Sequence, residues 1–175
     1  MSDSSETRDP LSLACELVGR FQYHFSRIEK ALDAGIAKVF SLNEGASTVL
    51  VANVDFIKKV NVIKTMAALQ FSDDGSLNKL LDRIAGVNTP HRQTVIHSTF
   101  EPYGEGSVRF KRTTTAGGKL KVDDPIWTGD DFSRHFKEMD RLATELEKVI
   151  AELKPYEPSL DFSDARNSTY ITLLF

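Results

Sequence analysis

The feature that most constrains the fold is a long stripe of apolar side chains near the N-terminus. Between residues 11 and 41, apolar residues recur at steps of three and four: Leu17, Phe21, Phe25, Ile28, Leu32, Ile36 and Val39. This spacing puts them on one face of an α-helix, which would be roughly 45 Å long at about 1.5 Å per residue. A long helix with one apolar face needs other elements to cover that face, so the sequence predicts a helical bundle.

Four further segments are predicted to be helical. They are a second helix over residues 46–71, a short third over 76–86, a short fourth over 90–99, and a long last helix over 130–153. The β-branched start of the second segment also fits a strand, but its later half keeps helical spacing. Thr89 and Pro90 suit the N-cap and first position of the fourth helix. Thr128 and Asp131 resemble a capping box before the last helix.

Between residues 107 and 123 the period of the apolar residues changes from helical to alternating. The alternation surrounds Ala116-Gly117-Gly118, which predicts a β-hairpin. We expect its apolar face to carry Val108, Phe110, Leu120 and Val122, and its opposite face to carry Arg109, Lys111, Lys119 and Lys121. The predicted fold class is therefore mainly α, a helical bundle with an inserted β-hairpin at about residues 107–123.

Length and composition are those of an ordinary globular domain. The 175 residues predict one domain over residues 11–154, preceded by a disordered polar lead over 1–10. Residues 155–175 form a C-terminal tail that ends in the apolar sequence TYITLLF, and we expect it to pack on the domain or on a partner. No apolar run approaches the ~20 residues that span a membrane.

Charge and cysteine content exclude several classes of protein. The net charge of −3 excludes a global positive field, so any nucleic-acid binding must use a local basic patch. The single cysteine, Cys15, excludes an internal disulfide and a cysteine-based zinc site, and a reducing cytoplasm is the simplest location. No cluster of His, Asp and Glu has metal-ligand spacing, so we expect neither a metal nor another cofactor.

Arg92 and His97 form an R-x-x-x-x-H pattern on the predicted fourth helix. An imidazole titrates near neutral pH and can act as general acid or base, while a guanidinium binds phosphate through two parallel hydrogen bonds. These two groups could cut RNA without a metal. Residues five apart on an ideal helix lie ~140° apart around its axis. A complete site therefore forms more easily across the two-fold axis of a dimer.

The pattern and its place in the helix order resemble the HEPN superfamily, which comprises all-helical domains of bacterial toxins and RNA-cleaving nucleases. The resemblance covers residues 11–153 in architecture and Arg92, Gln93 and His97 in motif. It implies a metal-independent endoribonuclease related to toxins or defence, with Arg92 and His97 as catalytic residues. It also implies that the protein is a homodimer and can have an antitoxin-like protein partner.

Other residues near the motif are candidates for binding RNA. His91 and Gln93 flank Arg92, and the basic hairpin face, with Arg112 added, could follow a phosphate backbone. That face could equally be a solvated ribbon whose lysines protect an edge strand. We expect His91 to be a solvent-facing residue of the first helical turn. His24 and His135 lie next to phenylalanines in the sequence and are expected to be packing or surface groups.

Structural roles for the motif are the alternative. Arg92 could form an ion pair with Asp82 or Glu101, and His97 could be an interior histidine beside Val95 and Ile96. The chain would then be a non-catalytic helical module that binds RNA, a nucleotide or a protein, or a structural dimerisation protein.

Overall fold

The computed structural model describes residues 9–71, 75–87, 91–116 and 119–157. Its helices are α1 (Pro10–Val39), α2 (Glu44–Ala52), α3 (Phe56–Gln70), α4 (Ser76–Val87), α5 (Gln93–His97) and α6 (Gly129–Glu152). Its strands are β1 (Thr99–Pro102), β2 (Val108–Ala116), β3 (Lys119–Asp123) and β4 (Ile126–Trp127). The predicted class is confirmed: the protein is mainly α, with a small antiparallel sheet before the last helix.

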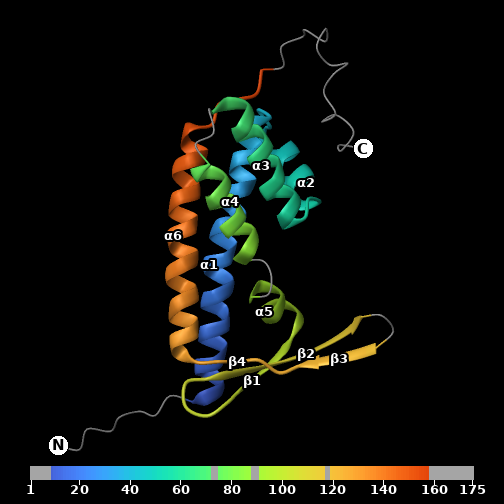
Figure 1. Cartoon of the computed structure of the whole chain (residues 1–175), viewed down its shortest axis with the longest axis vertical. Helices are drawn as coiled ribbons and strands as arrows, with labels where there is room; N and C mark the ends of the chain where they lie inside the picture. Colours follow the sequence, from blue (N-terminus) through green and yellow to red (C-terminus); the bar gives the residue numbers. More distant parts are fainter. Residues whose placement is uncertain (1–8, 72–74, 88–90, 117–118, 158–175) are drawn as a thin grey trace, which may run out of the picture.

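The two long helices, α1 and α6, lie side by side along the long axis of the molecule (Figure 1). They run parallel: Arg27 of α1 pairs with Glu147 of α6 at 3.2 Å, and Lys38, further along α1, donates to the carbonyl of Ala151 at 2.7 Å. The predicted stripe of α1 faces this contact, and its members from Phe21 to Val39 are buried. The apolar faces of the two helices therefore form the centre of the core.

The bundle is closed by α2, α3 and α4 at the end of α1 and α6 that lies away from the sheet (Figure 1). The close contact among α1, α3 and α6 occurs at Gly35. A Cβ atom at this position would lie 2.8 Å from Cδ1 of Ile63 and 3.1 Å from Cγ1 of Ile150. The absence of a side chain at Gly35 thus lets the three helices approach one another.

The prediction of one helix over residues 46–71 is wrong, because residues 53–55 separate α2 from α3. The side chain of Asn53 donates to the carbonyl of Val49 at 2.7 Å, and Asp55 is the N-cap residue of α3. Short polar side chains compete with the helical backbone hydrogen bonds in this way. The apolar spacing of the segment did not reveal this break.

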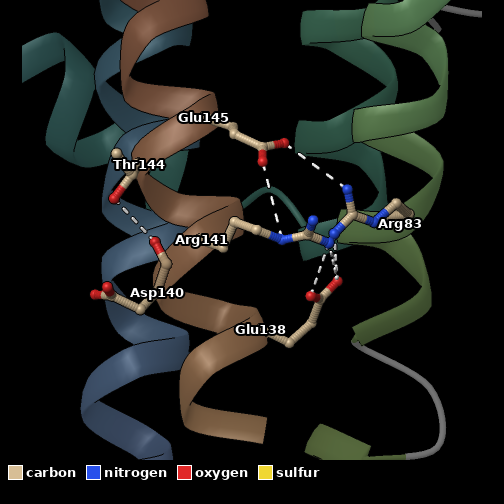
Figure 2. Close-up of polar contacts among 6 residues, drawn as sticks. All are labelled: Arg83, Glu138, Asp140, Arg141, Thr144 and Glu145. Carbon is tan, nitrogen blue, oxygen red and sulfur yellow. Dashed lines mark hydrogen bonds and ion pairs between the residues drawn. The ribbon is translucent and has the colours of Figure 1, made fainter. Parts of the chain in front are cut away.

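A network of charged side chains joins α4 to α6. Arg83 of α4 and Arg141 of α6 lie between Glu138 and Glu145, with their guanidinium groups facing each other (Figure 2). Each glutamate contacts both arginines, so the alternating charges neutralise one another. The four side chains are 38–55% exposed, so the network orients α4 more than it stabilises the fold.

The sheet lies across the end of the bundle at which α1 and α6 begin (Figure 1). Strand β2 pairs with β1 and β4 along its first half and with β3 along its second half. Val108 and Phe110 in the first half are buried, whereas Leu120 and Val122 of β3 are 69% and 60% exposed. The prediction of one shared apolar face is therefore wrong, because Val122 lies opposite Thr113 and Leu120 opposite Thr115. Side chains alternate along a strand, so these β2 positions face away from the side that carries Val108 and Phe110.

The end of α5 and the start of α6 can be compared with the sequence-based predictions. The predicted fourth helix over 90–99 is shorter, since α5 ends at His97 and β1 follows. The capping box is confirmed: Thr128 Oγ1 accepts from the Asp131 N–H, and the Asp131 carboxylate accepts from the Thr128 N–H at 2.8 Å. No helix in the described ranges has the length and apolar character required to cross a bilayer.

The two chain ends lie mainly outside the described residues. Of the predicted lead over 1–10, Asp9 caps α1 and Pro10 is its first residue. Of the tail over 155–175, the N–H of Tyr156 donates to the carbonyl of Val39 at 2.7 Å, so the start of the tail packs against the end of α1. The apolar sequence at residues 169–175 lies outside the described part.

Candidate functional site

A single helical turn, α5, connects the bundle with the sheet (Figure 1). His91 and Arg92 form a wider, π-type turn that leads into it. Thr94 and Val95 are buried, and the amide oxygen of Gln93 accepts a hydrogen bond from Nη2 of Arg112 at 3.2 Å. The hydrogen bond between Gln93 and Arg112 thus attaches α5 to β2.

Arg92 lies on the side of this turn that faces α1. Its guanidinium carbon is 4.8 Å from the centre of the Phe25 ring, and its Nε is buried without a hydrogen-bond partner among the described residues. The alternative ion pairs are wrong, because Asp82 pairs with Lys64 at 2.9 Å and Glu101 pairs with Lys111 at 2.8 Å. The guanidinium is held by an aromatic ring, and no carboxylate of the described residues neutralises it.

His97 ends α5 and is exposed to solvent. The alternative of an interior histidine is wrong, because the turn buries Thr94 and Val95 and leaves Ile96 43% exposed. Among the described residues, no hydrogen bond or ring contact joins Arg92 to His97. This agrees with the wide angle expected between residues five apart on a helix.

The arginines near α5 differ from the other described arginines in their lack of a carboxylate partner. Eight arginines belong to the described residues, and six of them have a carboxylate oxygen within 4 Å: Arg20, Arg27, Arg83, Arg109, Arg134 and Arg141. Within the described part of the chain, the two that lack such a partner are Arg92 and Arg112. Both belong to the surroundings of α5, and the Nε of each is buried and unpaired. We call them the α5 arginines.

His91 does not face solvent as predicted, because it is half-buried against α6. Its ring centre is 4.3 Å from that of His135 and 5.9 Å from that of Trp127, and His135 and Trp127 are 4.7 Å apart. Burial lowers the pKa of His91. Burial, aided by the proximity of His91, lowers the pKa of His135 to about 4. Both rings are therefore neutral at physiological pH.

The expectation that His24 and His135 are packing groups agrees with their contacts. His24 stacks on Phe136 with ring centres 5.2 Å apart, and His135 packs edge-on against Phe21 at 6.0 Å. Burial lowers the pKa of His24 as well. The contact of His135 with His91 is the additional feature that the sequence did not indicate.

A pocket of about 400 Å³ opens between α5 and the sheet. It is lined by His91, Thr94, Arg112, Asp123, Asp124, Pro125 and Trp127. One guanidinium, two carboxylates and the edge of an aromatic cluster thus meet in a single cavity. Its volume is within the range of small-molecule sites, at roughly 300–1,000 Å³.

The basic residues of the sheet are largely neutralised by nearby acids. Glu101 contacts both Lys111 at 2.8 Å and Arg109 at 3.4 Å, and Lys111 chiefly lowers the pKa of that carboxyl group. Lys121 pairs with Asp123 at 3.2 Å. The side chain of Lys119 lies outside the described part. The prediction that these cations share one face is wrong, because Lys121 lies opposite Thr114, an odd number of residues from Arg109 and Lys111. The described cations are therefore divided between the two faces of the ribbon and offer less unpaired positive charge than the sequence suggests.

Trp127, Asp123 and Asp124 were not among the sequence-based candidates. The signals available in the sequence were that the chain has a single tryptophan and that the two aspartates lie at the end of the predicted hairpin. No group of three or more metal-ligating side chains occurs among the residues that the structure describes.

No family model matches this chain, and no curated protein or solved structure matches it either.

Proposed function

We propose that this protein binds RNA at α5 and cleaves it without a metal ion, acting as a homodimer. The observation that carries the proposal is the pair of α5 arginines, Arg92 and Arg112, which lack carboxylate partners among the described residues. A guanidinium presents a planar fork that matches two phosphate oxygens. In a chain whose other described arginines are neutralised, the unpaired guanidinium groups at α5 favour this region for binding RNA.

In the proposed reaction His97 acts as the general base, supported by its exposure at the end of α5. Its imidazole accepts the proton of a ribose 2′-hydroxyl, and the 2′-oxygen forms a bond to the adjacent phosphorus. The bond from phosphorus to the 5′-oxygen breaks, and that oxygen takes a proton from water. Arg92 stabilises the negative charge on the phosphoryl oxygens, and the products carry a 2′,3′-cyclic phosphate and a 5′-hydroxyl.

The placement of these two groups supports the proposed dimer. Arg92 is held over Phe25, and His97 lies at the far end of α5 without contacting it. In the proposed dimer, Arg92 of one copy and His97 of the other act on the same phosphate. The separation within one protomer also favours the alternative function, which is RNA binding without cleavage.

A toxin or defence role with an antitoxin-like partner is the biological setting included in the proposal, because the HEPN-like pattern implies it. Induced expression of the wild type should slow growth of the host, and expression of His97→Ala should not. Equal growth inhibition by both would contradict a toxic nuclease.

The direct test is digestion of single-stranded RNA by purified protein, with and without EDTA. Wild type should produce 2′,3′-cyclic phosphate ends in both conditions. His97→Ala should abolish cleavage while keeping RNA binding, and the neighbouring surface variant Thr99→Ala should cleave as wild type does. Cleavage by His97→Ala at the wild-type rate would refute the assigned role. Binding of intact RNA by wild type without cleavage would establish the binding alternative.

A further inference from the structure

The pocket between α5 and the sheet combines chemical groups that one kind of ligand can satisfy together. Arg112 can donate several hydrogen bonds, whereas Asp123 and Asp124 can only accept them. Trp127 and His91 provide aromatic surface beside these polar groups. A matching ligand is flat, and it carries acceptors on one edge and donors on another.

The guanidinium of Arg112 is oriented by its surroundings and retains donors for a ligand. Its Nη2 donates to Gln93 at 3.2 Å, while its Nε is buried and unpaired among the described residues. It forms no ion pair with Asp123, although the two residues are opposite each other in the β2–β3 register. The pocket thus holds a cation and carboxylates that do not neutralise one another.

The two carboxylates differ in availability. Asp123 is held by Lys121 at 3.2 Å. Asp124 is exposed, and no described residue forms a hydrogen bond or an ion pair with it. Asp124 is therefore the carboxylate that can accept two hydrogen bonds from a ligand at the edge of the pocket.

Among the nucleobases, guanine matches this arrangement best. Its O6 and N7 accept two hydrogen bonds from an arginine, which is the commonest specific contact to guanine. On its Watson–Crick edge, N1–H and the N2 amino group are adjacent donors that one carboxylate can accept together. Adenine, cytosine and uracil do not present this combination of two adjacent donors and two adjacent acceptors.

We propose that this pocket binds a guanine base of the RNA, with Arg112 donating to O6 and N7 and Asp124 accepting from N1–H and the N2 amino group. The proposal rests on the proposed function, since RNA whose backbone phosphate is held by Arg92 brings its bases beside Arg112 and the pocket. Bases of single-stranded RNA are unstacked and open to recognition on these edges. The neutral rings of His91 and Trp127 form the wall beside the base.

The test is calorimetric titration of the full-length protein with the four nucleoside monophosphates, GMP, AMP, CMP and UMP. GMP should bind at least about tenfold more tightly than the others, since a bidentate pair contributes about that discrimination or more. The fluorescence of Trp127, the single tryptophan, should change on GMP binding because it lines the pocket. Asp124→Asn replaces one acceptor with a donor and should abolish the preference for GMP. Asp130→Asn, an exposed acid that does not line the pocket, should retain it.

The outcomes separate this proposal from the proposed function. Equal binding of all four nucleotides would show a phosphate site only and overturn the guanine pocket, as would no binding of GMP. Retention of the preference in Asp124→Asn would overturn the assigned contact. His97→Ala should leave GMP binding unchanged, so a failure of RNA cleavage and a failure of base recognition are observed independently.

Discussion

The cluster of His91, His135 and Trp127 predicts that acid destabilises the protein through His135. The perturbation is a fall in pH, compared between wild type and His135→Gln, whose side chain cannot be protonated. In the folded protein, burial and the adjacent His91 lower the pKa of His135 from 6.5 to about 4. In the unfolded chain, the same side chain has its ordinary pKa.

The sign of the effect follows from proton linkage. Between pH 6.5 and about 4 the unfolded chain binds a proton at His135 that the folded protein does not bind. The stability due to the neutral ring is therefore fully present above pH 6.5 and is lost as the pH falls toward 4. A pKa difference of this size corresponds to about 3.4 kcal/mol for a fully desolvated group. We reduce it to roughly 1.5 kcal/mol because water reaches this half-buried ring and screens its charge.

Urea denaturation at about pH 7.5 and about pH 4.5 measures the effect. Over this interval wild type should lose roughly 1 kcal/mol more of its free energy of unfolding than His135→Gln loses. Carboxylates that titrate in the same range contribute equally to both proteins, so the comparison removes them. Ser133→Gln, an exposed substitution on the same helix, should keep the wild-type pH dependence. Equal losses in wild type and His135→Gln would refute the conclusion that the fold holds this ring neutral.

Three further predictions concern packing and assembly. Gly35→Ala should destabilise by about 1 kcal/mol net of its helix propensity gain, because its Cβ would lie 2.8 Å from Ile63. Gly19→Ala on the same helix should instead stabilise the protein by about 0.5–1 kcal/mol, because a Cβ there would have no atom within 4 Å. Urea denaturation measures both variants, and equal gains would contradict the close packing at Gly35. Leu146→Ala in the buried face of α6 should cost about 2–5 kcal/mol, and a loss below about 0.5 kcal/mol would contradict its burial. Sedimentation at micromolar concentration should give twice the chain mass, and a monomer throughout that range would contradict the shared site.

Most of the helical fold could be predicted because the long helices bury one face along their whole length. The stripe of α1 and the capping box of α6 are both local in sequence, so spacing and residue type suffice to identify them. The break between α2 and α3 was missed because Asn53 ends α2 through its bond to the Val49 carbonyl without changing the apolar period. The strands β1 and β4 were missed because they are short, and pairing with β2 rather than their own pattern defines them.

The candidate site could be predicted only in its local part. The R-x-x-x-x-H pattern drew attention to Arg92 and His97, and their wide separation follows from helix geometry. The ring under Arg92 belongs to Phe25, and the ring beside His91 belongs to His135, both far away in sequence. Such contacts depend on how α1 and α6 pack together, which the spacing of residues near α5 does not determine.

The central claim is that the α5 arginines bind RNA because no described carboxylate neutralises them, with Arg92 contacting a backbone phosphate and Arg112 contacting a base. The most direct test is the affinity for single-stranded RNA at several salt concentrations, with Arg92 and Arg112 both replaced by Met. The matched control replaces Arg20 and Arg134 by Met. Arg20 also stacks on a phenylalanine at 4.8 Å, but both of these arginines have carboxylate partners.

The two double variants change the net charge equally, and Met keeps the apolar stem of each side chain. We predict that the α5 variant loses at least about tenfold in RNA affinity. The slope of log affinity against log salt concentration should fall in magnitude by about 0.7, for the one phosphate contact of Arg92. The control should bind RNA nearly as tightly as wild type, with the same salt dependence. Equal losses in both variants would show that only net charge matters, and wild-type affinity in the α5 variant would contradict the account.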